Sequence, residues 1–397
     1  MTAATAGERR RPLRIAYINN SLDLGGSERQ MLMLARHLPR DRFQVEFIML
    51  ARPGVLAPEA EAAGVVMHVL GGRSRRSAPF PVWAWHTAGT LLAFIRLIRR
   101  RRYDVVDAWL FTCYVFASVT RPFTRVPVLI SGRRSLSDYK EEFGLLKRLA
   151  ERLARATSDA FVANADAVAG DVRRREGIVD GRLRVIHNGV EPPAPMLPAE
   201  RRRIRGGWGV EDDAATLIGC VANYKPGKGH EVLIEAFART VQGRNVRLVL
   251  IGEGRLRETL ARQIADRGLT DRVVLAGSVP DPRPLYAAFD IGVLASESEG
   301  LPNGLLEAAA AGLSTVTTDA GGAREVVVDG ATGFVVPVGD HDALASALGR
   351  LVDDADLRRR FGAAARARIA TEFGVERCVE AFGRLYEELA SSRAGLP

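Results

Sequence analysis

Short runs of apolar residues alternate along the chain with longer segments in which apolar residues recur every three or four positions. Segment 28–38, for example, places Met31, Leu34, Ala35 and Leu38 on one side of a helix. The short runs between such segments are typical of buried parallel strands. In the first half we predict strands at 13–20, 45–50, 64–70, 103–109, 126–132, 159–165 and 182–190. Alternating strands and helices predict an α/β domain with a parallel sheet.

A proline-rich segment divides this pattern in two. Residues 191–200, EPPAPMLPAE, can form neither a helix nor a central strand, and they indicate a semi-rigid linker. A second series follows, with strands predicted at 216–224, 246–252, 272–279, 290–296, 314–319 and 333–337. Between the third and fourth of these strands we predict a helix at 282–288. We therefore predict an N-terminal domain over 1–190, a C-terminal domain over 191–374, and a helix in 375–397 that packs back across the domain junction. Each domain would be a doubly wound parallel sheet, and the two would face a central cleft.

Positive charge is concentrated in the first half of the chain. Residues 1–195 hold 31 Lys and Arg against 19 Asp and Glu, a net charge of +12, whereas the remainder has a net charge of −3. Only four of the 56 basic residues are lysine, so a bias toward arginine could explain the excess. An anionic membrane surface or an acidic acceptor is another explanation. The candidate for a membrane contact is the predicted helix 82–102, which has five arginines in its last seven residues, although arginines in a last turn also complement the helix dipole. We expect no nucleic acid partner, because no helix-turn-helix, zinc or aromatic-basic pattern is present.

The sequence also favours a cytoplasmic location. Its three cysteines have no metal-like spacing, no apolar run reaches about 18 residues, and the N-terminus lacks the apolar core of a signal peptide. A peripheral position at the inner membrane surface stays open.

The most informative stretch is 296–312, SESEGLPNGLLEAAAAG. Pro302 has the residue type favoured at the first position of a helix, and Gly312 would end that helix. The helix N-terminus would hold a phosphate near Gly300 and Leu301. Glu307 lies roughly 7.5 Å further along the axis, and Glu299 lies in the loop before it. Two carboxylates around an anion site suit a nucleotide sugar.

Two further glycine-bearing loops follow predicted strands. Gly25 and Gly26 allow the backbone to approach a ligand after the first strand, although a tight turn explains them equally well. The loop 227–229 follows the first strand of the second series.

With these motifs in place, the chain resembles the GT-B fold, retaining glycosyltransferases of family 4, which consist of two Rossmann-like domains. The resemblance rests on GGSE (25–28), VIHNGVE (185–191), GKGH (227–230), LIGEG (250–254), VLAGSVPD (274–281), SESEGLPNGLLEA (296–308) and AGGAREVVVDGATGFVV (320–336).

The resemblance implies a role for each candidate residue. Lys228 would bind the diphosphate, Glu307 the ribose hydroxyls, and the backbone near Val279 the base edge. Glu299 would be catalytic, facing the donor hexose near the reacting carbon. Gly25 and Gly26 would leave room for the diphosphate and the acceptor between the domains.

Two positions depart from the family pattern. Asn223 stands where family members often have an arginine, and Lys225 could supply the missing charge. The loop after strand 126–132 has Arg133 and Arg134 where many members have a histidine, so no general base is assigned.

The resemblance further implies a metal-independent reaction with no cofactor beyond the donor. The Asp-x-Asp sequence at Asp354 to Asp356 is better explained as a helix cap than as a metal site.

The resulting hypothesis is a retaining glycosyltransferase that moves a hexose-type sugar from a nucleotide-diphosphate sugar to a glycan or lipid-linked acceptor. Cell-surface polysaccharide or glycolipid synthesis would be its setting. The alternatives are a nucleotide-sugar epimerase on the same fold and a non-catalytic relative that only binds a nucleotide sugar.

Overall fold

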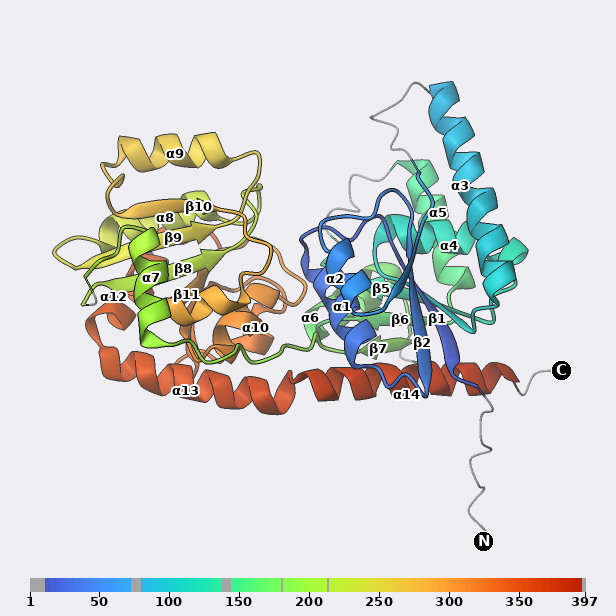
Figure 1. Ribbon diagram of the computed structural model, residues 1–397. Coiled ribbons are helices and arrows are strands. Elements are labelled where there is room, and N and C mark those ends of the chain that lie inside the picture. Colours follow the sequence, from blue (N-terminus) through green and yellow to red (C-terminus); the bar gives the residue numbers. More distant parts are fainter. Residues whose placement is uncertain (1–10, 73–79, 138–143, 180, 213, 395–397) are drawn as a thin grey trace, which may run out of the picture. The chain divides into compact units, whose positions relative to one another are not determined.

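The computed structural model describes residues 11–72, 80–137, 144–179, 181–212 and 214–394. The chain divides into two compact units (Figure 1). The first comprises residues 1–163, 172–186 and 378–397, and the second comprises 164–171 and 187–377.

The first unit is built on a seven-stranded parallel sheet with the order β3-β2-β1-β4-β5-β6-β7. Its strands are β1 (Leu13–Asn19), β2 (Phe43–Met49), β3 (Val66–Val69), β4 (Val105–Ala108), β5 (Val128–Arg133), β6 (Ala160–Ala163) and β7 (Leu183–Val185). The helices between them are α1 (Gly26–His37), α2 (Ala57–Ala62), α3 (Phe80–Arg101), α4 (Phe111–Thr124) and α5 (Leu145–Thr157). Side chains of α3, α4 and the sheet share one buried cluster, which α5 joins through Ala154.

The second unit is built on a six-stranded parallel sheet with the order β10-β9-β8-β11-β12-β13. Its strands are β8 (Thr216–Val221), β9 (Val246–Ile251), β10 (Val273–Gly277), β11 (Ile291–Leu294), β12 (Ser314–Thr318) and β13 (Gly333–Val336). Its helices are α7 (Pro198–Gly207), α8 (His230–Thr240), α9 (Arg257–Asp266), the 3-10 helix η3 (Arg283–Ala288), α10 (Asn303–Ala310), α11 (Ala323–Val326), α12 (His341–Asp353) and α13 (Ala355–Glu372).

Two helices begin in the second unit and continue into the first. These are α6 (Asp166–Glu176) and α14 (Val375–Ala394). Within the first unit, Phe382 and Tyr386 of α14 are buried, and Phe382 stacks on Trp109 with ring centroids 5.9 Å apart.

The predicted alternation and the parallel sheets are confirmed, and the strand orders are those of doubly wound domains. In such sheets the order reverses at one point, and ligands bind there at the carboxyl ends of the strands. The reversal in the second unit lies between β8 and β11, so the loops after these two strands are the expected ligand loops.

Three sequence predictions need correction. The strand predicted over 182–190 ends at Val185, because the following residues form a loop whose side chains bind other segments. The helix predicted over 282–288 is a 3-10 helix, and Pro284 lies within it. Pro302 precedes the helix rather than starting it, since its ψ of 108° is extended and α10 begins at Asn303. Among the described residues, no helix is long and apolar enough to cross a bilayer.

Candidate functional site

The loops after β8 and β11 are docked against each other by their backbones. The N–H of Glu297 donates to the carbonyl of Gly227 at 2.9 Å. Gly229 has a φ of 64°, and a Cβ there would lie 1.9 Å from the carbonyl oxygen of Ala295. Only glycine combines this left-handed backbone with so close an approach. The GKG sequence therefore fixes how the two loops meet.

This docking brings Lys228 and Glu299 together. The Lys228 Nζ donates to Glu299 Oε1 at 2.5 Å, and their side chains are only 20% and 12% exposed. Lys225 belongs to the same loop; burial and the nearby Lys228 lower its pKa, although the residue still reaches solvent. Asn223 is exposed at the start of the loop. The structure thus unites the predicted catalytic carboxylate with the predicted diphosphate-binding lysine.

The N-terminus of α10 lies directly after this loop. Gly300 and Leu301 are both buried, and no side chain caps the helix at Pro302. Gly304 lies in the first turn, and a Cβ there would lie 3.2 Å from the Val221 carbonyl oxygen. Its missing side chain therefore lets the start of the helix pack against the end of β8. The helix N-terminus and Lys228 together favour a negatively charged group.

The loop after β12 packs against the backbone of Gly300. The N–H of Gly322 donates to the Gly300 carbonyl at 2.9 Å, and a Cβ on Gly322 would lie 2.2 Å from that oxygen. Gly322 of the AGGA sequence (320–323) therefore packs against the loop that contains Gly300.

Glu307 lies half-buried on α10. It is close enough to Arg283 to contribute to a raised pKa of that guanidinium, whose main cause is the hydrogen bond to Asp281. Val279 precedes η3 and packs against the apolar cluster beneath it. Arg283 was not among the predicted site residues. Its position two residues after the VPD motif is the signal that could have identified it.

The segment 185–191 forms hydrogen bonds to the first residue of α10 and to the first residue of η3. Asn188 Nδ2 donates to Asn303 Oδ1 at 2.7 Å, at the first residue of α10. Glu191 Oε2 accepts from Arg283 at 2.7 Å. These contacts explain why a short loop after β7 carries so specific a sequence.

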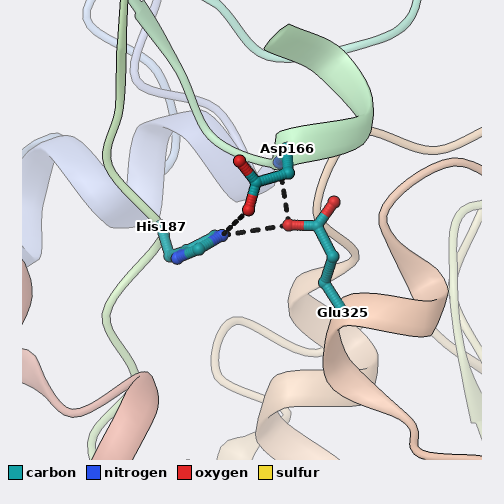
Figure 2. A group of neighbouring side chains, drawn as sticks. All are labelled: Asp166, His187 and Glu325. Carbon is teal, nitrogen blue, oxygen red and sulfur yellow. Dashed lines mark hydrogen bonds and ion pairs between the residues drawn. The ribbon is translucent and has the colours of Figure 1, made fainter. Parts of the chain in front are cut away.

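His187 of the same segment belongs to a cluster of polar side chains that we did not predict from the sequence. His187 Nε2 lies 3.0 Å from Glu325 Oε2 and 3.8 Å from Asp166 Oδ2 (Figure 2). Glu325 also accepts the N–H groups of Asp166 and Ala167, each at 2.8 Å, so it caps the N-terminus of α6. Burial opposes its charge, but the bonds from His187 and these N–H groups outweigh that effect and lower its pKa.

Three ligand atoms of this cluster are close enough to hold a metal ion. Both Glu325 oxygens already accept backbone N–H groups, however, and Asp166 is 72% exposed. The contacts favour a capping role that secures the start of α6. Asp354 also acts as a cap, accepting from the Leu357 N–H at 2.8 Å as predicted.

The first unit places its predicted residues at the start of α1. Gly25 is the residue before the helix and Gly26 is its first, exposed residue. A Cβ on Gly25 would lie 2.2 Å from Glu28 Oε2. Asn19 at the end of β1 donates to Glu28 at 3.0 Å, while burial raises the pKa of that carboxyl. The absence of a side chain at position 25 therefore has a local packing reason as well.

Arg133 and Arg134 do not point to an acceptor site. Arg133 is 3% exposed and is paired with Glu151 at 3.0 Å and Glu176 at 2.9 Å. The guanidinium group of Arg134 lies over the ring of Trp109, 3.8 Å from its centroid, and its Nε and Nη2 atoms are buried. Both guanidinium groups are parts of the interior of the first unit.

Comparison with known proteins identifies two successive family regions. Residues 24–192 match the model described as Glycosyltransferase Family 4, and residues 202–368 match the model described as Glycosyl transferases group 1. A D-inositol 3-phosphate glycosyltransferase of Xylanimonas cellulosilytica is 28% identical over 94% of this chain and 93% of its own.

Other relatives match in part. An N-acetyl-alpha-D-glucosaminyl L-malate synthase of Bacillus anthracis is 30% identical over 46% of this chain. In this relative and two others, the match spans about half of the relative's length.

Among solved structures, Anabaena HepE in complex with UDP-glucose has a TM-score of 0.81 and 22% identity, covering 96% of this chain and all of its own. Sucrose-phosphate synthase from Thermosynechococcus elongatus has a TM-score of 0.79 and 20% identity, with the same coverage. These likenesses show a shared fold.

Proposed function

Since the chain belongs to the glycosyltransferases of the GT-B fold and resembles family 4 among them, we propose that it transfers a hexose-type sugar from a nucleotide-diphosphate sugar to a glycan or lipid-linked acceptor. The observation that carries the proposal is the Lys228–Glu299 pair at the β8–β11 reversal, beside the uncapped N-terminus of α10. A cation, a helix dipole and a carboxylate at one point suit a sugar joined to a diphosphate.

Donor binding would exchange partners within this pair. The diphosphate takes over the Lys228 ammonium and the first-turn N–H groups of α10, and Lys225 adds charge on the side of Asn223. Glu299 is then released to face the hexose. Glu307 accepts hydrogen bonds from the ribose hydroxyls, and the backbone near Val279 meets the base edge. Gly25 and Gly26 leave space for the diphosphate and the acceptor.

In the transfer step, the bond from the anomeric carbon to the diphosphate oxygen breaks and a bond to an acceptor hydroxyl oxygen forms. Negative charge develops on the leaving diphosphate, where Lys228 and the helix N-terminus stabilise it. The acceptor proton passes to the leaving diphosphate, and the configuration at the anomeric carbon is retained. Charge stabilisation by these groups needs neither a metal ion nor a further cofactor.

The acceptor belongs to cell-surface polysaccharide or glycolipid synthesis in this proposal. Support comes from relatives named for lipopolysaccharide core biosynthesis in Rhizobium meliloti and for Vi polysaccharide biosynthesis in Salmonella typhi. These names describe the relatives themselves.

The test begins with a panel of nucleotide sugars screened for an increase in melting temperature. The stabilising donor is then incubated with candidate glycan and lipid-linked acceptors, and NMR determines the anomeric configuration of the product. Transfer with retention in the presence of EDTA supports the proposal. Conversion of the donor to an epimer without an acceptor would instead identify an epimerase, and binding without turnover on any acceptor would favour a non-catalytic relative.

A further inference from the structure

Helix α5 exposes its leucines and buries its glutamate. Leu145, Leu146, Leu149 and Leu153 are 73%, 82%, 48% and 41% exposed. Glu151 is buried on the opposite side. A surface helix of a globular protein normally faces the core with its apolar side. Here the arrangement is inverted.

The inverted orientation is held by specific contacts. Glu151 accepts a hydrogen bond from the Tyr114 hydroxyl at 2.9 Å and from Arg133 at 3.0 Å. Arg133 is also paired with Glu176 and lies 4.2 Å from the Tyr114 ring centroid. Rotating α5 to bury its leucines would leave the buried Arg133 without one of its carboxylates, which is strongly unfavourable. The exposed leucines are therefore a consequence of the fold.

The leucines form one stripe with arginines along its edge. At 3.6 residues per turn, the four leucines fall within an arc of about 100°. Arg148, Arg152 and Arg155 fall on the adjoining arc, and the first two are exposed. Glu151 is the one acidic residue between positions 144 and 157, and it faces inward. The outer face of α5 is thus apolar and cationic, without a negative charge.

This face differs from the rest of the described surface. Of the 14 large hydrophobic side chains that are exposed among the described residues, four belong to this single helix. The others are spread in ones and twos over loops, strands and other helices. A leucine stripe beside arginines on one helix is the pattern of helices that lie in the interface of a bilayer.

We propose that α5 docks the protein onto an anionic lipid surface. Leu145, Leu146, Leu149 and Leu153 insert among the acyl chains nearest the headgroups, and Arg148 and Arg152 contact lipid phosphates. The net charge of +12 over residues 1–195 adds attraction to such a surface. None of these observations concerns the transfer reaction, so the proposal stands independently of it.

The structure also shows why α5 is a better candidate than the arginine-rich end of α3. Arg99 Nε donates to the Phe123 carbonyl at 2.7 Å. Arg101 Nε lies 3.4 Å from the buried Glu46. Two of the arginines that suggested a membrane contact from the sequence are therefore engaged in joining α3 to its neighbours.

The test measures binding of the full chain to vesicles by flotation, using phosphatidylcholine alone and phosphatidylcholine mixed with phosphatidylglycerol. We expect binding to the anionic vesicles only. The double variant Leu146→Gln/Leu149→Gln should bind at least about tenfold more weakly, because each leucine contributes apolar burial. Arg148→Gln/Arg152→Gln should bind roughly tenfold more weakly and lose most of the salt dependence.

Two control variants make the same types of substitution at exposed residues of the second unit. Leu197→Gln alters a leucine that is 71% exposed in the second unit, and Arg202→Gln/Arg203→Gln alters two exposed arginines of α7. Both should bind vesicles like the wild type. All variants change exposed side chains, so their melting temperatures should match that of the wild type and separate lost docking from lost folding.

Three outcomes would overturn the proposal. The first is equal binding to neutral and anionic vesicles, and the second is unchanged binding of the leucine variant. The third combines two results: light scattering shows a dimer for the wild type and a monomer for the leucine variant, and flotation shows no vesicle binding by either protein. That result would assign the stripe to a second copy of the chain.

Discussion

Lys228 and Glu299 form a hydrogen-bonded ion pair of 2.5 Å, with both side chains largely withdrawn from solvent. Each residue neutralises the other where we propose that the donor binds. An anionic ligand that takes over the lysine thus also releases the carboxylate. This exchange links diphosphate binding to the availability of Glu299, and two predictions test it separately.

Replacing Lys228 should weaken binding of the diphosphate and leave nucleoside binding largely intact. A charge-assisted hydrogen bond contributes about 1.5–3 kcal/mol, so Lys228→Ala should raise the Kd for the nucleoside diphosphate roughly 10-fold to 100-fold. Calorimetry with the nucleoside diphosphate and the nucleoside measures both effects. Equal losses for the two ligands would contradict a diphosphate role, and Arg202→Gln serves as the control.

Replacing Glu299 should act on turnover rather than on nucleotide affinity. Glu299→Ala should reduce kcat at least about a hundredfold, because a carboxylate beside the reacting carbon is lost, while the Kd of the nucleoside diphosphate changes little. Steady-state kinetics with the stabilising donor provides the measurement. Glu258→Ala, which removes an exposed carboxylate from α9, should keep full activity. Wild-type turnover in Glu299→Ala would remove Glu299 from the mechanism.

Replacing Glu325 should destabilise the protein in a pH-dependent way. Its carboxylate accepts from His187 and from the N–H groups of Asp166 and Ala167, and its pKa is lowered in the folded state. The contribution of this group is therefore present above the unfolded pKa of about 4.3 and is lost as the pH falls through the lower folded pKa. At neutral pH, Glu325→Gln should cost about 2 kcal/mol.

Urea unfolding of the wild type and Glu325→Gln over a pH series measures this difference. It should shrink toward zero in acid. A difference that stays constant from neutral pH to below the unfolded pKa would show that charge is not responsible.

Asp107 should produce the opposite pH dependence. Burial raises its pKa to about 6, and the Tyr386 hydroxyl donates to it at 2.8 Å. The folded state therefore binds a proton that the unfolded state releases near pH 3.9, so this group makes stability fall as the pH rises from about 4 to about 6. Asp107→Asn should remove that part of the slope. Thermal unfolding across this range checks the prediction, and an unchanged slope in Asp107→Asn would refute it.

The order of elements was predictable from the sequence because apolar runs and helical periods are local patterns. The placement of Lys228 in a loop after a strand, and of Glu299 and Glu307 before and within a helix, was predictable for a similar reason, since glycines and prolines mark loops and helix starts. The roles of these three residues came from the family resemblance and stay predictions. The Lys228–Glu299 bond itself was not accessible, because it depends on the backbone bond between Glu297 and Gly227.

Which side of a helix faces outward could also not be predicted from the sequence. The period of α5 shows an apolar arc, but only the contacts of Glu151 show that this arc faces outward. Arg133 could be read from the sequence as a substitute for a site histidine, whereas the structure buries it among carboxylates. The cluster around Glu325 joins three distant segments, so no local pattern could predict it.

Neither unit is one continuous stretch of chain, and this limits how the protein can be divided for experiments. Residues 164–171 belong with the second unit, although they lie well before the proline-rich linker. A fragment cut at that linker would lack His187 and the two N–H donors at Asp166 and Ala167, leaving the Glu325 carboxylate with none of these three partners. Chimaeras that exchange the second unit with that of a relative should therefore transplant 164–171 together with the segment from His187 onward.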